Sequence, residues 1–204
     1  ANLFSTIKGK NSNDKGIVLS GHTDVVPATA SEWTSDPYEA REEKDKIYGR
    51  GTSDMKGFIA CVLAVAPLFK SEKLKKPIHF SFTFDEETGC LGAPLVLADL
   101  KKRNLNFSAC IIGEPTSMKP ITSHKGYNEY VTHFTGLSGH ASNPDVGVNA
   151  IEYAIEYSNK LLELRDTLKK RNVDKNIFIP PYSTLQIGKI SGGVGANVIA
   201  DKCS

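Results

Sequence analysis

Short apolar runs alternate with helical patterns along the first half of the chain. Residues 78–84 alternate phenylalanine or isoleucine with polar side chains, which is the period-two pattern of a strand. Residues 55–69 are apolar nearly all round, which predicts a buried helix that ends near Pro67. The predicted elements, in chain order, are a strand at 17–19, a helix at 55–69, a strand at 78–84, a helix at 91–102 and a buried strand at 109–112. This order predicts an α/β sheet that is at least partly parallel.

The second half follows a different pattern, and we place the boundary between the two halves near residues 119–125. A long amphipathic stripe predicts a helix that starts at Ala150, with Asn149 or Asp145 as its cap. The other predicted features are a strand at 127–134, turns at 136–147, a polar loop at 172–181, a strand at 184–190 and the start of a strand at 197–200. The sequence therefore predicts two domains, 1–120 and 121–204.

Composition and charge narrow the class of protein. The 204 residues are 40% hydrophobic and 24% charged, and the formal net charge is +2. These values are typical of a globular protein with a core and give no argument for a nucleic-acid or membrane partner. The four cysteines have irregular spacings without a C-x-x-C pair, which predicts free thiols in a cytoplasmic protein. Cys61 and Cys110 lie in apolar runs, where we expect them to be buried.

Ionisable residues follow each predicted strand of the first half. They are His22 and Asp24 after the first strand, Asp54 before the first helix, Glu86 and Glu87 after the second strand, and Glu114 after the third. Because ligands of open α/β sheets bind at the carboxyl ends of strands, these side chains are expected to converge. One imidazole and several carboxylates suit Zn²⁺, Co²⁺ or Mn²⁺.

Each of these residues also has an ordinary structural explanation when it is taken alone. A histidine after a strand is usually a loop residue, Asp54 before a helix is most often an N-cap, and Glu86–Glu87 is most often a solvated pair. Taken together they favour a cation, because several carboxylates at strand ends are costly without one. His22 and Asp24 share one face of an extended segment, so the carboxylate could orient the imidazole. Glu86 and Glu87 would point in opposite directions if the chain there is extended.

Several segments together resemble the M20 family of co-catalytic metallopeptidases and deacylases. The matching segments are 20–27, 49–57, 86–87, 113–116, 138–142 and 192–199, all in the family's order. The resemblance implies a catalytic domain with a mixed, mostly parallel sheet and helices on both faces, joined to an α+β lid and dimerisation domain. It also implies two zinc ions, replaceable by cobalt, in each complete active site, and a homodimer formed through the lid.

The resemblance assigns a role to each residue of the first half. His22, Asp54 and Glu114 would hold one metal, with Asp54 bridging to a second metal bound by Glu87. Glu86 would be the general base, and Asp24 the partner of His22. The resemblance further implies a cis peptide bond between Asp54 and Met55.

In the second half the resemblance points to three residues. His140 would stabilise the oxyanion and Asn197 would grip the substrate, each reaching the active site of a neighbouring protomer. Lys125 is a weaker candidate for contact with a substrate carboxylate. Without the resemblance, His140 would be interpreted as a turn residue and Lys125 as a surface lysine. His79 is expected to be structural, and a role for His124 near the site stays open.

The matching segments near 114–126 and 180–193 most resemble enzymes that release acetate from N-acetyl-L-ornithine in arginine biosynthesis. The alternatives are a succinyl-diaminopimelate desuccinylase, another aminoacylase or carboxypeptidase of the family, or a non-catalytic metal-binding or dimerisation module. The family's second metal has a further histidine ligand that no residue here matches. We therefore expect a chain shortened at both ends, which binds at most one metal tightly and has little activity by itself.

Overall fold

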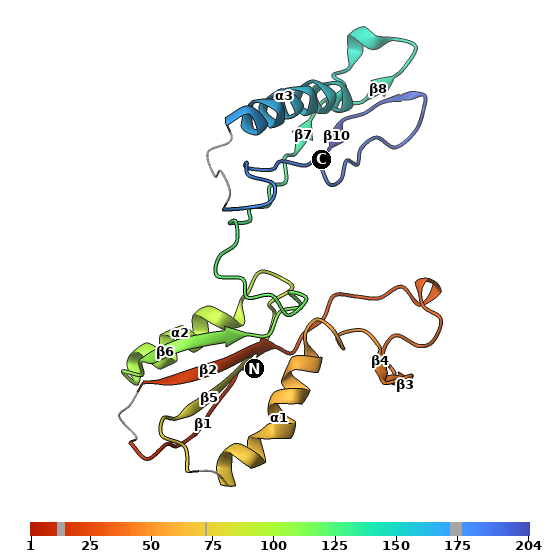
Figure 1. Cartoon of the computed structure of the whole chain (residues 1–204). Coiled ribbons are helices and arrows are strands. Elements are labelled where there is room, and N and C mark those ends of the chain that lie inside the picture. The colour runs from red at the N-terminus through yellow and green to blue at the C-terminus, as the bar shows by residue number, and fades with distance from the viewer. Residues whose placement is uncertain (12–14, 72, 172–176) are drawn as a thin grey trace. The chain divides into compact units, whose positions relative to one another are not determined.

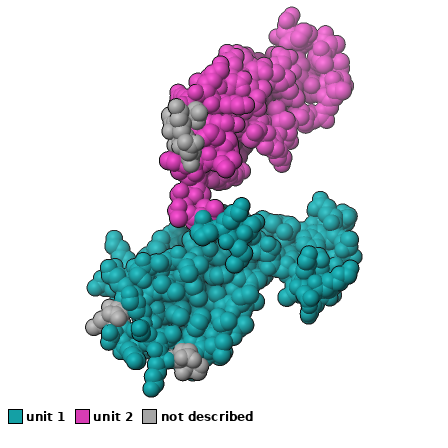
Figure 2. Space-filling view, in the orientation of Figure 1, with its two compact units in different colours: residues 1–120 teal, residues 121–204 magenta. Residues whose placement is uncertain are grey.

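The structure is a computed structural model that describes residues 1–11, 15–71, 73–171 and 177–204. The chain forms two compact units, Ala1–Pro120 and Ile121–Ser204, which are coloured separately in Figure 2. Each unit is described below by itself. In the described part of the chain, no helix combines the length and the apolar character that a membrane span requires.

A four-stranded sheet forms the centre of unit 1. Its strands are ordered β1 (Leu3–Ile7), β5 (Ile78–Thr83), β2 (Gly16–His22) and β6 (Phe107–Ile112) (Figure 1). β2 runs parallel to both β5 and β6, while β1 pairs antiparallel with β5. The sheet is therefore mixed and mostly parallel, as predicted. The carboxyl ends of β2, β5 and β6 consequently meet at one edge.

Two helices pack on this sheet. On one face, α1 (Lys56–Ser71) buries Ile59 and Val62 against Phe80 and Phe82 of β5. On the other face lies α2 (Gly92–Lys102). Arg103, which caps its C-terminal end, lies 5.3 Å from the ring centroid of Phe4, and Phe4 stacks on His79 of β5. Since Phe80 and His79 are neighbours in a strand, their side chains point to opposite faces. Helices thus lie on both faces of the sheet, as predicted.

His79 is a structural residue of the sheet, as expected. Its side chain is 5% exposed, its Nδ1 lies 2.9 Å from Oγ1 of Thr6, and its ring meets Phe107 edge-on at 4.8 Å. Burial lowers the pKa of the imidazole, and the positive charge of Arg103 lowers it further. His79 is the second residue of β5, so it lies at the amino end of the strand, away from the carboxyl end.

The predicted end of the first helix and the predicted burial of two elements in unit 1 are wrong. The helix does not stop near Pro67 but runs through it to Ser71, and it is not buried all round, because Leu63 is 54% exposed. Pro67 cannot donate to the carbonyl of Leu63, and on this exposed side water can satisfy that carbonyl. β6 is an edge strand rather than a buried one: Ile112 is 61% exposed. Cys61 of α1 and Cys110 of β6 are exposed for the same reasons.

The segment between β2 and α1 carries a small hairpin. It contains a 3-10 turn at Ala30–Glu32 and the antiparallel pair β3 (Arg41–Glu43) and β4 (Lys46–Tyr48). Figure 1 shows this hairpin set apart from the sheet. The chain then returns through Arg50, whose guanidinium lies 5.4 Å from the ring of Trp33, and reaches Asp54 just before α1.

Unit 2 is built around α3 (Ala150–Arg171). Asn149 caps the helix, as one of the two predicted caps, because its Oδ1 accepts a hydrogen bond from the N–H of Ile151 at 3.0 Å. Ala150 and Ala154 pack against Cys203. The short elements around the helix are the pairs β7 (Phe134–Thr135) with β10 (Lys202–Cys203) and β8 (Gly139–His140) with β9 (Val198–Ile199), and the 3-10 turn Pro144–Val146.

The strand predictions for unit 2 are only partly confirmed. The strand at 197–200 exists as β9, but of the strand predicted at 127–134 only its last residue, Phe134, falls in a strand, and 184–190 has no regular structure. Apart from Phe134, the residues of these two segments pair with no strand in the described part of the unit, and a β-pattern forms a strand only where a partner strand lies beside it. Residues 172–176 of the predicted polar loop lie outside the described residues.

Candidate metal centre

His22 lies at the middle of a group of carboxylates at the carboxyl edge of the sheet. It is the last residue of β2, and its side chain is 2% exposed. Its Nε2 lies 3.1 Å from Oδ1 of Asp54, 3.7 Å from Oε1 of Glu114 and 3.9 Å from Oε2 of Glu86. Asp54 precedes α1, while Glu114 and Glu86 follow β6 and β5. The parallel strands thus bring together residues up to 92 positions apart in the sequence.

These side chains form two overlapping groups that could hold a metal ion. His22, Asp54 and Glu114 are one group, and His22, Glu86 and Glu87 are the other; within each group the ligand atoms lie within 4.8 Å of one another. One imidazole nitrogen and several carboxylate oxygens match the preferences of Zn²⁺ and similar divalent ions. The residues present therefore fit a divalent cation.

Asp24 supports both the histidine and the acidic turn. Its main-chain carbonyl accepts a hydrogen bond from Nδ1 of His22 at 2.9 Å, and its Oδ2 accepts one from the N–H of Glu87, also at 2.9 Å. The Asp24 carboxylate lies farther from Nδ1, at 3.5 Å, so the carbonyl rather than the predicted carboxylate orients the ring. Because Nδ1 carries the donated proton, the neutral imidazole has its free lone pair on Nε2, facing the carboxylates.

The charges of the site shift the pKa values of its members. Burial lowers the pKa of His22, but the carbonyl of Asp24 and the carboxylates of Asp54, Glu114 and Glu86 outweigh it, so the net pKa is raised. Burial and the negative charge of Asp54 raise the pKa of Glu114. For Asp24, burial raises the pKa but the N–H groups of Glu87 and Glu86 outweigh it and lower the pKa. The cluster thus holds more negative charge than one imidazolium neutralises, which favours a cation.

Close packing of the backbone positions Glu114. Gly113 precedes Glu114, and a Cβ atom on Gly113 would lie 1.9 Å from Cγ of Phe58 in α1, so only glycine fits there. The N–H of Gly113 also donates to the carbonyl of Ser20 in β2 at 3.1 Å. The Asp54–Met55 peptide bond is cis, which confirms the prediction.

The acidic pair lies in a turn rather than in an extended segment. The N–H groups of Gly89 and Cys90 donate to the carbonyl of Glu86 at 3.1 and 3.0 Å. Both carboxylates consequently approach His22, and the opposite directions expected for an extended chain do not apply to this turn. The turn also brings the Sγ of Cys90 to 3.4 Å from Oε1 of Glu86, a hydrogen bond that the sequence analysis missed.

The remaining candidates belong to unit 2. His140 of β8 is exposed, and its Nδ1 lies 2.7 Å from Oγ of Ser142. Asn197 is near it, because its carbonyl accepts a hydrogen bond from Ala141 at 3.0 Å. Lys125 donates to the carbonyls of Pro180 and Tyr182, so its ammonium group is already bound by main-chain oxygens. Nδ1 of His124 lies 2.8 Å from the adjacent carbonyl of Lys125.

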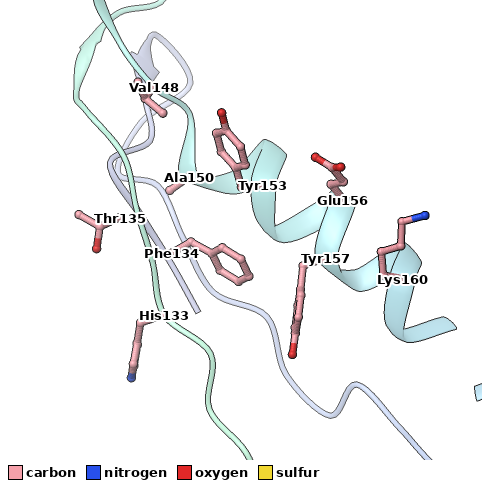
Figure 3. A pocket seen from close by; sticks show the side chains of 9 residues that line it. All are labelled: His133, Phe134, Thr135, Val148, Ala150, Tyr153, Glu156, Tyr157 and Lys160. Carbon is pink, nitrogen blue, oxygen red and sulfur yellow. The ribbon is translucent and has the colours of Figure 1, made fainter. Parts of the chain in front are cut away.

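Unit 2 also contains a hollow of about 580 Å³ between α3 and β7. Figure 3 shows Phe134 pointing toward α3, and its ring centroid lies 5.6 Å from that of Tyr157. Aromatic and aliphatic side chains form most of the wall, and Glu156 and Lys160 bring charge to it. The hollow contains none of the proposed metal ligands.

Comparison with known proteins agrees with the resemblance seen in the sequence. The model of the peptidase family M20/M25/M40 matches residues 18–181. Acetylornithine deacetylase from Edwardsiella ictaluri is 41% identical over 202 residues, covering 99% of this chain and 52% of that protein. The enzyme of the same name from Salmonella typhimurium is 42% identical, with the same coverage. The chain thus spans about half the length of the curated relatives it matches.

Solved structures share the fold at lower sequence identity. An M20 family metallo-carboxypeptidase from Sulfolobus solfataricus has a TM-score of 0.65 and 19% identity over 99% of this chain and 58% of that one. A tripeptidase from Staphylococcus aureus has a TM-score of 0.63 and 21% identity over 99% of this chain and 50% of that one. At such identities the likeness concerns the fold.

Proposed function

Because the chain belongs to peptidase family M20/M25/M40, we propose that it is the metal-binding half of a zinc-dependent amide hydrolase that deacetylates N-acetyl-L-ornithine. The observation that carries the proposal is the position of Glu86, beside a three-residue ligand set of His22, Asp54 and Glu114. The identity of about 42% to acetylornithine deacetylases supports the substrate, and release of acetate would serve arginine biosynthesis.

The protein groups divide the work of hydrolysis between them. His22, Asp54 and Glu114 would hold the ion, which when bound would polarise the amide carbonyl and lower the pKa of water. Glu86 would take a proton from the attacking water and pass it to the leaving amine, since its Oε2 lies beside the ligand set, 3.9 Å from Nε2 of His22. Its other oxygen, Oε1, accepts the thiol hydrogen of Cys90. Asp24 keeps His22 and the Glu86–Glu87 turn in position.

The described residues offer good ligands for one ion. The two candidate groups share His22, whose Nδ1 donates to the carbonyl of Asp24, so only Nε2 remains for a metal. Glu87 together with a bridging Asp54 would supply part of a second site. We therefore propose one tight site in this chain and a second site that needs a further ligand.

We also propose that unit 2 is the lid and dimerisation domain of a cytoplasmic homodimer. His140 of β8 and Asn197, which directly precedes β9, are both exposed and lie on adjoining segments, which suits two residues that act together on a substrate. Lys125 is retained as a substrate contact only if substrate displaces its ammonium group from the carbonyls of Pro180 and Tyr182. The four cysteines are free, which is in keeping with the cytoplasm.

The test is the Glu86→Ala variant of the whole protein, assayed for release of acetate from N-acetyl-L-ornithine and for bound metal. We expect activity to fall by a factor of at least about 100, with metal content retained. Glu39→Ala, which removes an exposed glutamate of the β2–α1 segment, is the matched control and should be fully active. Unchanged activity in Glu86→Ala would refute the proposed base.

The substrate is tested separately on the unmodified protein. Turnover of N-acetyl-L-ornithine should exceed that of N-succinyl-diaminopimelate and of unblocked dipeptides. Faster turnover of the succinyl compound would make the protein a desuccinylase. A protein that binds the ion but hydrolyses neither these three compounds nor other N-acyl amino acids would be a non-catalytic metal-binding module.

A further inference from the structure

Met55 is a buried residue that the proposed chemistry does not use. Its side chain is 0% exposed, and its Sδ accepts a hydrogen bond from the main-chain N–H of His22 at 3.2 Å. Methionine sulfur is a weak acceptor and rarely takes a main-chain hydrogen bond in place of a carbonyl oxygen. The position of this contact, at the residue that carries the imidazole, calls for a physical explanation.

The sheet explains why the N–H of His22 needs an acceptor outside the strands. The N–H of Thr23 donates to Thr83 of β5 at 2.9 Å. Successive N–H groups of a strand point to opposite sides, so the N–H of His22 points toward β6. Pairing of β2 with β6 ends at Ser20 and Ile112, two residues earlier. Without the sulfur this buried donor would have no partner, which is costly.

The shape of the site fits the methionine closely. A Cβ atom on Gly21 would lie 2.9 Å from Cε of Met55 and 3.1 Å from Cγ1 of Ile59. The absence of a side chain at Gly21 therefore makes the space into which the methyl group of Met55 packs. Met55 is confined between β2 and α1, so its sulfur is held at a fixed position.

We infer that Met55 is a positioning residue for the metal centre, and that the Asp54–Met55 dipeptide meets His22 at both its ring and its main chain. Asp54 contacts the imidazole at Nε2, and Met55 holds the main-chain N–H of the same residue. Loss of the Met55 acceptor would leave the main chain at His22 less firmly placed relative to the carboxylate of Asp54. The inference rests on the proposed metal centre but not on the identity of the substrate.

The experiment compares Met55→Leu with Val62→Ala in the whole protein. Leucine keeps most of the volume of methionine but has no acceptor atom. Val62 of α1, the helix that follows Met55, is 4% exposed and packs in the core with Phe80 and Phe82, so its truncation weakens the fold without removing an acceptor from His22. Binding of Co²⁺ alone is measured by visible absorption against a competing chelator, and thermal denaturation reports the stability of each variant.

We expect Met55→Leu to weaken Co²⁺ binding about tenfold, the lower end of the range for residues that orient a ligand. Val62→Ala should bind Co²⁺ like the unmodified protein, even if its melting temperature falls as much as that of Met55→Leu. In the metal-free protein, the amide proton of His22 should exchange faster with solvent in Met55→Leu than in Val62→Ala.

Two results would overturn the inference: Co²⁺ binding in Met55→Leu equal to that of the unmodified protein, or an equal loss of binding in Val62→Ala. The next result would overturn the proposed deacetylase activity and leave the inference about Met55 standing. If the unmodified protein binds Co²⁺ but does not hydrolyse N-acetyl-L-ornithine, while Met55→Leu still binds more weakly, the positioning role of Met55 is supported without the deacetylase.

Discussion

Nε2 of His22 lies 3.1 Å from Oδ1 of Asp54, so a proton on this nitrogen and a metal ion would occupy the same space. Although burial lowers it, the pKa of His22 is raised overall by the Asp24 carbonyl and the carboxylates of Asp54, Glu114 and Glu86. Protonation of His22 therefore competes with the cation already at a pH above the ordinary histidine value of about 6.5.

The first prediction follows from this competition. Co²⁺ affinity should fall as the pH is lowered through the raised pKa of His22, approaching about tenfold per pH unit below it. Titrations between pH 8.5 and pH 6 would measure the fall. His140→Gln, which alters an exposed histidine of unit 2, should leave the profile unchanged. Constant affinity over this range would contradict the assignment of His22 as a ligand.

The second prediction concerns Asp24. Its Oδ2 accepts the N–H of Glu87 at 2.9 Å, whereas its contact with the ring of His22 uses the main-chain carbonyl. Asp24→Ala should thus loosen the acidic turn but keep the hydrogen bond to the ring, and weaken Co²⁺ binding about tenfold. Asp24→Asn keeps an acceptor oxygen, so its effect should be smaller. Equal affinity in Asp24→Ala and the unmodified protein would show that the turn needs no such support.

The third prediction concerns the contact between Gly113 and Phe58. Gly113→Ala would place a methyl group 1.9 Å from the present position of Cγ of Phe58, so the ring or the strand end must move. We expect a loss of about 1–3 kcal/mol in the free energy of unfolding and weaker metal binding, because Glu114 is the next residue. Urea denaturation measures the first effect and Co²⁺ titration the second. Gly126→Ala is the control, since no atom lies within 4 Å of a Cβ there; an equally mild effect at both positions would contradict the packing argument.

The fourth prediction concerns acid stability. Burial, and then the charge of Arg103, lower the pKa of His79 in the folded protein. As the pH falls below about 6.5, the unfolded chain takes up a proton at this residue before the folded chain does, which favours unfolding. His79→Gln should make the unfolding free energy fall less between pH 7 and pH 5 than it does in the unmodified protein. His133→Gln, at an exposed position, should keep the full pH dependence; if His79→Gln keeps it too, His79 is not its source.

The sequence was sufficient for the elements that carry the site, because local pattern and chain order are enough for them. The period-two pattern of 78–84 predicted β5, and the order of strands and helices predicted the parallel sheet whose edge gathers His22, Asp54, Glu86 and Glu114. Burial was harder to predict, because it depends on partners distant in the chain. The apolar β6 is an edge strand, and the residues at 184–190 match a strand pattern without forming one.

Directions of side chains were the other limit. Glu86 and Glu87 both approach His22 because the chain turns after β5, and two adjacent letters in a sequence do not reveal such a turn. The hydrogen bonds of Met55 and Cys90 were missed because sulfur is usually interpreted as a packing atom. Gly89, which lies between Glu86 and Cys90, was the signal that could have indicated the turn around Cys90.

The parallel arrangement of β2, β5 and β6 has a consequence for how unit 1 would melt. The proposed ligands come from the ends of three strands and from the segment just before α1, so an ion bound there would link four segments that are distant in the chain. By mass action, an ion at 100 times its dissociation constant would stabilise the folded form by about 2.7 kcal/mol. A chelator should therefore lower the melting temperature of unit 1 and leave that of unit 2 unchanged. The proposed ion would then stabilise the sheet against heat in addition to its role in hydrolysis.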